Sequence, residues 1–336
     1  MKRLALLIVL ALALAGGFLA LEAMRRLEPA AIAAPPQLFM VEEGAGLRRV
    51  ATELERAGLI RDARAFEALG RYEKAENQLR AGEYELAATQ APAEILDTIV
   101  SGRIKLWPVT VPEGLTAVEI APLVAAAGLA DRDAFLAVVN DPGSPERFGV
   151  EGPGLEGYLF PETYHLAHGL TAEQVVAAFL AQFKSVWEPL AASAGARGLS
   201  MRQAVTLASI VEKETAVPDE RPLVAAVFHN RMRLGMRLET DPTVIYGIPS
   251  FDGNLTRAHL EDASNPYNTY KIAGLPPGPI ANPGAGALRA AVEPASSDAL
   301  FFVSRNDGSH VFSRTYEEHV GNVQRFQVRR EVGDGG

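Results

Sequence analysis

The chain has 336 residues, with 41 Asp and Glu against 32 Lys and Arg, a net charge of −9 and no cysteine. An apolar fraction of 48% excludes wholesale disorder, and the acidic balance argues against nucleic-acid partners, which need clustered Lys and Arg. The lack of cysteine excludes a disulfide scaffold, a cysteine nucleophile and a thiolate metal site. The length suggests two domains, or one large domain with extensions.

An uncharged run follows two basic residues at the N-terminus. Lys2 and Arg3 precede Leu4–Leu21, which would span about 27 Å as a helix, close to the hydrocarbon thickness of a bilayer. Because basic residues favour the cytoplasmic side, we predict a cytoplasmic tip and transmembrane anchor at 1–27. A cleaved signal peptide is the alternative, and either interpretation exports the rest of the chain. The Ala/Pro-rich stretch 28–37 is predicted to be a linker.

An internal repeat with an offset of 70 positions lies within residues 38–150. Val-Glu-Glu-Gly at 41–44 matches Val-Pro-Glu-Gly at 111–114, and Ala-Gly-Leu at 57–59 recurs at 127–129. Each copy is predicted to begin as a short strand, turn at glycine and continue as an amphipathic helix that ends at Ala-Gly-Leu.

The first copy continues with a predicted helix at 63–69, an alternating strand at 82–86 and a helix at 92–100. A strand–helix–helix–strand unit of this size resembles a LysM-like carbohydrate-binding module, so residues 38–150 are predicted to form a LysM-like α+β region. A scaffold without glycan contacts is the alternative, because similarity of fold is weak evidence for function.

Residues 151–330 are predicted to form a second, mixed α+β domain, followed by a tail at 331–336. The stretch 237–283 is rich in Pro, Asn, Gly, Tyr and Thr, and so long an irregular segment in a compact domain is usually functional. The predicted helices lie at 171–187, 200–215, 221–234, 285–292 and 316–326, and a predicted hairpin joins strands at 300–305 and 310–314.

The helix at 200–215 carries the most informative carboxylates. It opens with the capping box Ser200-Met201-Arg202-Gln203, and Glu214 lies at the edge of its apolar stripe while Glu212 lies on the other flank. The helix dipole and partial burial would both raise the pKa of a carboxyl at this end, as a general acid for glycoside cleavage requires. A solvated acidic helix end is the alternative. The stripe consists of Ala204, Leu207, Ala208 and Val211.

Other chemistries have little support in the sequence. His165 and His168 have no third metal ligand nearby, so no metal site is predicted. Ser209 lacks the glycines of a nucleophile elbow and is predicted to be an ordinary helix residue. The glycine patterns of dinucleotide and nucleotide sites are absent as well, so no cofactor is predicted.

Residues 209–216, Ser-Ile-Val-Glu-Lys-Glu-Thr-Ala, resemble the signature of the endolytic murein transglycosylase (YceG-like) family. The resemblance covers nearly the whole chain, and the helix at 200–215 shows no departure from the family pattern. It continues through the strings at 156–164, 220–221, 224–228, 230–231, 235–238, 240–247, 267–270 and 274–280.

The resemblance implies an enzyme that cleaves the β-1,4 bond between N-acetylmuramic acid and N-acetylglucosamine within peptidoglycan strands and leaves 1,6-anhydro ends. In that chemistry the sugar's own C6 hydroxyl attacks, so one carboxyl group is sufficient, whereas hydrolysis requires a second carboxylate. The resemblance further implies a single-pass protein of the cell inner membrane with a periplasmic catalytic domain. Its implied partners are glycan strands and peptidoglycan synthases (penicillin-binding proteins), with a role in limiting strand length.

Carried over to this sequence, the resemblance assigns the catalytic acid to Glu214. Glu212 and Asp241 remain candidate second carboxylates. Sugar-stacking rings are predicted at Tyr158, Phe160 and Tyr164, for which a plain core role is the alternative, and hydrogen bonds to sugars are predicted for Glu162, Thr240, Asp241, Tyr246, Asn268 and Tyr270. Two other functions stay open: a hydrolytic muramidase that uses Glu214 with Asp241, and a non-catalytic peptidoglycan-binding protein.

Overall fold

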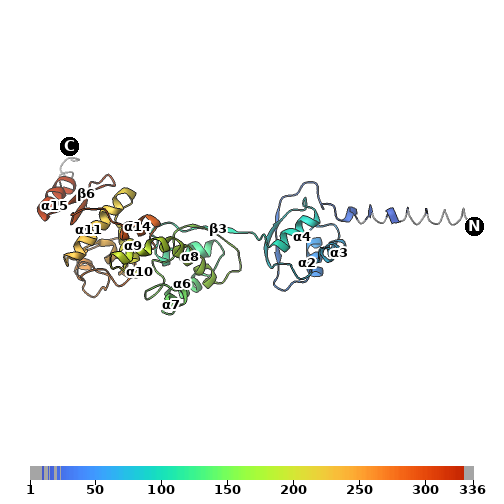
Figure 1. The fold of residues 1–336 in the computed structure, drawn as a ribbon, viewed down its shortest axis with the longest axis horizontal. Coiled ribbons are helices and arrows are strands. Elements are labelled where there is room, and N and C mark those ends of the chain that lie inside the picture. The colour runs from blue at the N-terminus through green and yellow to red at the C-terminus, as the bar shows by residue number, and fades with distance from the viewer. Residues whose placement is uncertain (1–9, 11–13, 15, 19–20, 23, 329–336) are drawn as a thin grey trace, which may run out of the picture. The chain divides into compact units, whose positions relative to one another are not determined.

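The structure is a computed structural model that describes residues 10, 14, 16–18, 21–22 and 24–328. Most of the predicted anchor, Leu4–Leu21, lies outside the described residues. In the part of the chain that is described, no helix combines the length and the apolar character that a membrane span requires. The predicted α+β class is confirmed, because helices alternate with two-stranded sheets (Figure 1).

The chain divides into two compact units. Unit 1 comprises the described residues up to Trp107 together with His165–Gly169, and unit 2 comprises Pro108–Tyr164 and the described residues from Leu170 onward. The chain passes between the units in β3 (Trp107–Thr110) and β4 (Thr163–Leu166), which pair with each other. The sequence placed this boundary near residue 150 instead.

Unit 1 has the strand–helix–helix–strand order that the sequence predicts. Its strands pair antiparallel, so that Phe39 lies opposite Tyr84, and both rings are buried against Leu54 and Phe66 in one core. Alternation of buried and exposed residues along the strands explains why they form a half-covered sheet. The elements are β1 (Gln37–Val41), α2 (Leu47–Arg56), α3 (Ala63–Tyr72), β2 (Gly82–Leu86) and α4 (Pro92–Ser101).

The internal repeat is visible in the backbone. Helix α5 (Ala117–Ala126) has the same length as α2 and lies 70 positions later in the chain. Both helices are followed by a glycine in the left-handed conformation, Gly58 with φ 71° and Gly128 with φ 68°. A residue with a Cβ would be strained there, which explains why Ala-Gly-Leu ends both helices.

The second copy of the repeat nevertheless belongs to unit 2. Helix α5 packs against α6 (Arg132–Asn140), which in turn packs against α8 (Ala172–Trp187). Both carboxylate oxygens of Glu156 also accept hydrogen bonds from the backbone N–H of Ala117, at 3.1 Å. The first copy needs none of these contacts because its own two strands and helices close a core, so the unit boundary falls between the copies.

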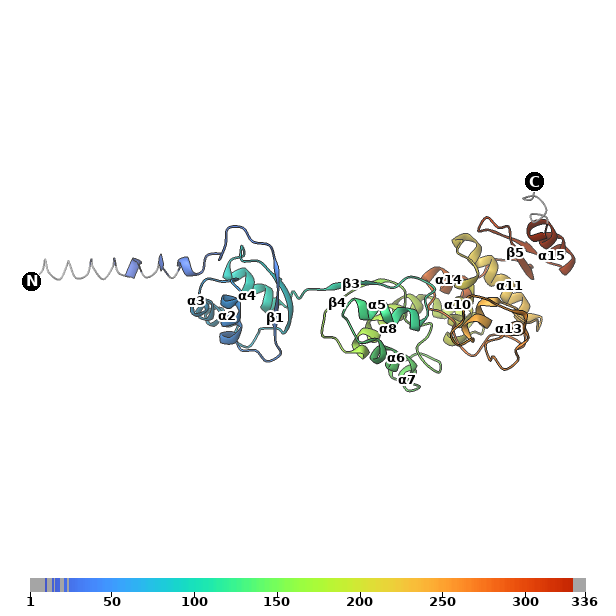
Figure 2. The same ribbon diagram turned by 180° about the vertical axis from the view of Figure 1, so that it is seen from behind.

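Unit 2 is organised around α10 (Met201–Glu214). The predicted capping box is present, since the Ser200 side chain accepts from the Gln203 N–H and the Gln203 side chain accepts from the Ser200 N–H. Residues Ala204–Val211 are buried on every side. The helix packs against α14 (Ala285–Val292) and α11 (Arg221–Arg233), both labelled beside it in Figure 2, and against α12 (Asp241–Tyr246).

The remaining elements of unit 2 are short. The predicted irregular stretch 237–283 contains only two short helices, and the predicted C-terminal hairpin is an antiparallel pair in which Phe302 lies opposite Phe312. These elements are α7 (Ser144–Phe148), α9 (Ala191–Ala196), α13 (Arg257–Glu261), β5 (Phe301–Ser304), β6 (His310–Ser313) and α15 (Tyr316–Val323), with 3₁₀ turns at Glu188–Leu190 and Pro218–Glu220 and a π-helical turn at Gln324–Val328.

Candidate active site

A cavity of about 320 Å³ in unit 2 opens beside the last residue of α10. Its lining combines polar and aromatic residues, which is the usual composition of a small-molecule site. The charged and hydroxyl-bearing residues are Glu214, Arg231, Glu239, Thr240 and Asp241. The aromatic and apolar residues are Phe228, Leu238, Tyr270, Phe301, Phe302, Tyr316 and His319.

Glu214 is the half-buried carboxyl of this cavity. Burial raises its pKa, and the neighbouring charge of Asp241 acts in the same direction. The hydrogen bond that the Thr240 hydroxyl donates to Glu214 Oε1, with the charges of His310 and Arg231, lowers the pKa without cancelling the effect of burial. Glu214 therefore holds its proton to a higher pH than an exposed glutamate, as a general acid must.

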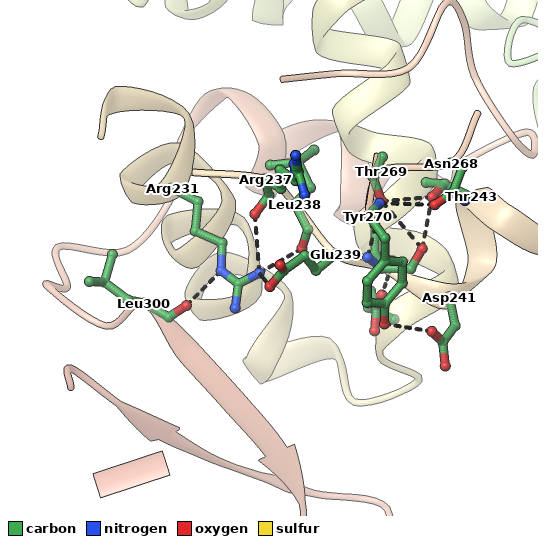
Figure 3. A network of polar contacts seen from close by, with 12 residues as sticks. Arg231, Arg237, Leu238, Glu239, Asp241, Thr243, Asn268, Thr269, Tyr270 and Leu300 are labelled. Atoms are coloured by element: carbon green, nitrogen blue, oxygen red, sulfur yellow. Dashed lines mark hydrogen bonds and ion pairs between the residues drawn. The ribbon is translucent and has the colours of Figure 1, made fainter. Parts of the chain in front are cut away.

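Hydrogen bonds among three threonines hold Thr240, the hydrogen-bond partner of Glu214, in position. The Thr240 N–H donates to Thr269 Oγ1 at 3.1 Å, and the Thr243 hydroxyl donates to the Thr240 carbonyl at 2.7 Å (Figure 3). The hydroxyls of Thr243 and Thr269 lie 2.8 Å apart in the buried interior. These bonds join the segment before α12 to the segment around residue 269, so the Thr240 hydroxyl faces Glu214 from a rigid support.

Arg231 holds two segments of the chain that contribute residues to the cavity. Its Nε donates to the Leu300 carbonyl and its Nη1 to the Leu238 carbonyl, both at 2.7 Å (Figure 3). Its guanidinium also lies over the Phe301 ring, 5.2 Å from the centroid. Burial lowers the pKa of Arg231, but an arginine starts so high that it stays charged. This residue lies in the Asn-Arg string of the family resemblance, but no local pattern indicates its role.

Asp241 and Tyr270 form a second polar group on the cavity. The Tyr270 hydroxyl donates to Asp241 Oδ1 at 2.7 Å. Asn268 is fully buried, and its side-chain amide donates to three backbone carbonyls of the α13 region while its Oδ1 accepts from the Tyr270 N–H at 3.0 Å. Asn268 thus positions Tyr270 rather than facing the cavity.

Glu212 lies in a different environment from Glu214. Its carboxylate pairs with Arg221 at 2.9 Å and accepts from the Gly284 N–H at 3.0 Å, and its side chain is 6% exposed. Burial raises its pKa, while the hydrogen bond from Gly284 and the charge of Arg221 oppose that effect. Glu113 also pairs with Arg221, at 3.1 Å. Glu212 therefore ties α10 to neighbouring segments and does not line the cavity.

The aromatic segment predicted to stack on sugars lies in the core. Tyr158, Phe160 and Tyr164 are 0%, 5% and 8% exposed, and none of them lines the Glu214 cavity. Tyr158 packs edge-on against Phe183, with centroids 5.0 Å apart, and Tyr164 packs on Phe179 at 4.3 Å. The structure therefore favours the core alternative for these rings. Glu162 of the same segment is exposed and also lies off the cavity.

Tyr246 belongs to a second cavity of about 130 Å³. Its hydroxyl donates to Glu156 Oε2 at 3.4 Å, and its ring contacts Tyr267 at 4.8 Å. Burial raises the pKa of Glu156 to about 7, although hydrogen bonds from Ala117 and Asn282 oppose the effect. The sequence did not indicate that Glu156 has a raised pKa, because segments far apart in the chain form its environment.

Two residues considered for other chemistries have structural partners. Ser209 is buried, and its Oγ donates to the Thr206 carbonyl and accepts from the Ile280 N–H. His168 stacks on Trp107 with centroids 4.7 Å apart and approaches Glu83 at 3.3 Å. Across the residues that the structure describes, no three His, Asp or Glu side chains gather as a metal site would require.

Comparison with known proteins gives one family. The model of the YceG-like family matches residues 39–325. The chain is 37% identical over 173 residues, 51% of its length and 48% of the relative's, to a protein of Bacillus subtilis (strain 168) named endolytic murein transglycosylase. A protein of the same name from Streptococcus pneumoniae (strain D39) is 32% identical over 244 residues, 64% of this chain and 43% of the relative.

The chain thus spans about half the length of the curated relatives it matches. A solved structure of a yceG-like protein from Listeria monocytogenes is similar with a TM-score of 0.59 and 30% identity, over 86% of this chain and 99% of the other. The family match extends over both units and includes every residue of the Glu214 cavity. This chain therefore belongs to the YceG-like family.

Proposed function

We propose that the protein is an endolytic peptidoglycan lytic transglycosylase, which cleaves the β-1,4 bond between N-acetylmuramic acid and N-acetylglucosamine within glycan strands. The observation that carries this proposal is the Glu214 carboxyl, whose pKa is raised, in a cavity lined by both polar and aromatic residues. The names of the Bacillus and Streptococcus relatives support the substrate class.

The proposed reaction uses the same carboxyl twice. Protonated Glu214 donates its proton to the glycosidic oxygen, and the bond between that oxygen and the anomeric carbon breaks. The resulting carboxylate then accepts the proton of the C6 hydroxyl, whose oxygen bonds to the anomeric carbon and closes the 1,6-anhydro ring. Glu214 ends protonated and no water is consumed. The Thr240 hydroxyl, which donates to Glu214 Oε1, stabilises the carboxylate between the two steps.

A hydrolytic muramidase is the second candidate, because Asp241 lines the same cavity as Glu214 and could activate water. Cleavage in water enriched in ¹⁸O separates the two reactions. A lytic transglycosylase gives anhydro ends without ¹⁸O, whereas a muramidase gives reducing ends that carry it. Reducing ends labelled with ¹⁸O would replace the proposed reaction by hydrolysis.

We further propose a place for this reaction in the cell. The basic residues and uncharged run at 1–27 favour a single-pass anchor in the inner membrane, with the linker 28–37 and both units in the periplasm. Tethering would confine cleavage to newly made strands near the membrane and so limit their length, beside penicillin-binding synthases. Resistance of the protein to carbonate extraction is the expected result, and release into the soluble periplasmic fraction would contradict the anchor.

We also propose a glycan-binding role for unit 1. Its strand–helix–helix–strand order and antiparallel pairing are those of a LysM-like module. Binding of unit 1 to peptide-free glycan strands would support this role, and a unit that folds without binding them would leave it a scaffold.

A further inference from the structure

Several of the rings that line the Glu214 cavity come from the last elements of the chain. Phe301 lies at the start of β5, and Tyr316 and His319 lie in the first turn of α15. Tyr316 is 69% exposed although its ring contacts Phe301 at a centroid distance of 5.9 Å. His319 stacks on Phe301 at 5.2 Å with an interplanar angle of 22°. A large ring is therefore held on a packed support with most of its surface open to solvent.

We propose that Tyr316, supported by Phe301, forms a sugar-binding subsite in the Glu214 cavity, on which a pyranose ring next to the cleaved bond stacks. This inference rests on the proposed function, because it takes a glycan as the occupant of the cavity. It assigns to the C-terminal hairpin and helix the stacking role that the sequence assigned to residues 158–164.

The chemistry of the occupant follows from the polar and aromatic residues that line the cavity. A β-linked amino sugar carries its polar substituents around the ring edge and axial C–H groups on its faces. The C–H faces suit the negative face of an aromatic ring, and the edge suits carboxylates and hydroxyls. Tyr316 provides such a ring, while Glu214, Asp241 and Thr240 provide the polar groups across the same cavity.

The support of Tyr316 is fixed by contacts on both of its elements. Arg231 holds the start of β5 through the Leu300 carbonyl and covers Phe301 with its guanidinium. The Thr315 side chain caps α15 by accepting from the Glu318 N–H at 3.2 Å. Burial lowers the pKa of His319, so its imidazole is neutral at neutral pH and its stack on Phe301 carries no charge. A ring held in place before binding loses little conformational entropy when a sugar arrives.

The test measures binding of peptide-free glycan strands, made from sacculi with an amidase, to full-length protein carrying Glu214→Gln so that no strand is cut. Addition of Tyr316→Ala is expected to weaken binding about tenfold, the cost of removing an aromatic anchor. Tyr316→Phe keeps the ring and should bind within about twofold of the parent. In the active enzyme, Tyr316→Ala should raise KM while kcat is retained.

Two further variants keep the result interpretable. Leu234→Ala removes another exposed apolar side chain of unit 2, one that does not line the cavity, and should leave binding unchanged. Tyr316→Leu keeps apolar bulk without a ring, so it replaces the alanine variant if that variant melts at a lower temperature. Equal binding by the parent, Tyr316→Ala and Tyr316→Leu would overturn the subsite. So would a parent that binds peptide-carrying strands only.

Failure of the subsite is distinguishable from failure of the proposed function. If the wild-type chain produces anhydro ends while Tyr316 variants bind and cut normally, only the subsite is wrong. If the wild-type chain produces no new ends and binds no strands, the proposed function itself fails.

Discussion

The two sides of the C-terminal end of α10 present the same residue type in opposite situations. On one side Glu212 meets Arg221 and the Gly284 N–H, and its charge is matched within a packed interior. On the other side Glu214 receives one hydroxyl hydrogen bond, from Thr240, and forms no ion pair among the described residues. Burial raises the pKa of both carboxyls.

The difference lies in what compensates the burial. A buried carboxylate with a cation and a backbone donor contributes to the structure, and removing it leaves the cation unpaired. A buried carboxyl without a cation is poised to hold a proton and to give it up, at a cost in stability that the fold tolerates. Glu212 and Glu214, two residues apart on one helix, therefore have different roles: the first is a structural link and the second is a candidate acid.

The largest expected effect is that of Glu214→Gln. Glutamine keeps the size of the side chain and can accept the Thr240 hydrogen bond, but it cannot donate a proton to the glycosidic oxygen. Activity on sacculi should fall by about two to four orders of magnitude, while the melting temperature at pH 7 should not fall, because burial of an ionised carboxyl costs stability. Product formation and thermal unfolding measure the two effects.

Glu146→Gln is the matched control for that experiment, since Glu146 is exposed on α7 and lies off the cavity. It should change neither activity nor stability. If Glu214→Gln retains wild-type turnover while Glu212→Gln loses it, the assignment is wrong, and the acid is Glu212 on the other flank of the helix.

Glu212→Gln should show the reverse pattern. Loss of its charge leaves Arg221 with Glu113 alone, and Glu113 is about half exposed. We expect a loss of about 2 kcal/mol in the free energy of unfolding, with the kcat of the folded fraction unchanged. Denaturant unfolding combined with kcat per folded molecule checks this, and an inactive but fully stable variant would contradict it.

Thr240→Val tests the hydrogen bond to Glu214 through pH. The hydroxyl lowers the pKa of Glu214, so its removal should raise that pKa. Because the acid must be protonated to act, kcat/KM falls as pH rises through its pKa, and this alkaline limb should move to higher pH in the variant. At neutral pH the rate should drop about tenfold, since the carboxylate formed in the first step loses a donor. An alkaline limb at the same pH in the variant and the wild type would show that the Thr240 hydrogen bond does not set the pKa of Glu214.

The effect expected for Glu156 leaves catalysis unchanged and appears only above acidic pH. Its pKa is raised from the ordinary 4.5 to about 7, so between these values the folded chain retains a proton that the unfolded chain has released. Stability therefore falls as pH rises from about 4.5 to 7. Glu156→Gln should increase the free energy of unfolding by about 1–3 kcal/mol at pH 8 and change it little at pH 4. A lower stability at pH 8 would mean that the ionised carboxylate is well compensated.

Local signals in the sequence predicted most of the helices and strands. The capping box at Ser200 and the apolar stripe fixed α10, and the glycines Gly58 and Gly128 marked the ends of both repeat helices. Four predicted polar residues, Glu214, Thr240, Asp241 and Tyr270, do meet at one cavity. Their motifs belong to the resemblance, and the fold brings the segments together.

The misplaced residues share a physical cause. An aromatic-rich string predicts burial and sugar stacking equally well, and only the packing of α8 decides that Tyr158 and Tyr164 are core. Tyr316 looks like an ordinary first residue of a capped helix, and its place on the cavity depends on the hairpin that precedes it. The unit boundary likewise depends on which helices cover α5, a contact that no local pattern records.

The most direct test of the account is the chemistry of the chain ends made by wild type and Glu214→Gln. Sacculi are incubated with each full-length protein, digested with a muramidase, and the muropeptides are separated and identified by mass spectrometry. The account predicts 1,6-anhydro-N-acetylmuramic acid ends at internal positions with wild type, and their loss with Glu214→Gln. Anhydro ends made equally by both proteins, or reducing ends made by wild type before the muramidase is added, would contradict Glu214 as the acid of a lytic transglycosylase.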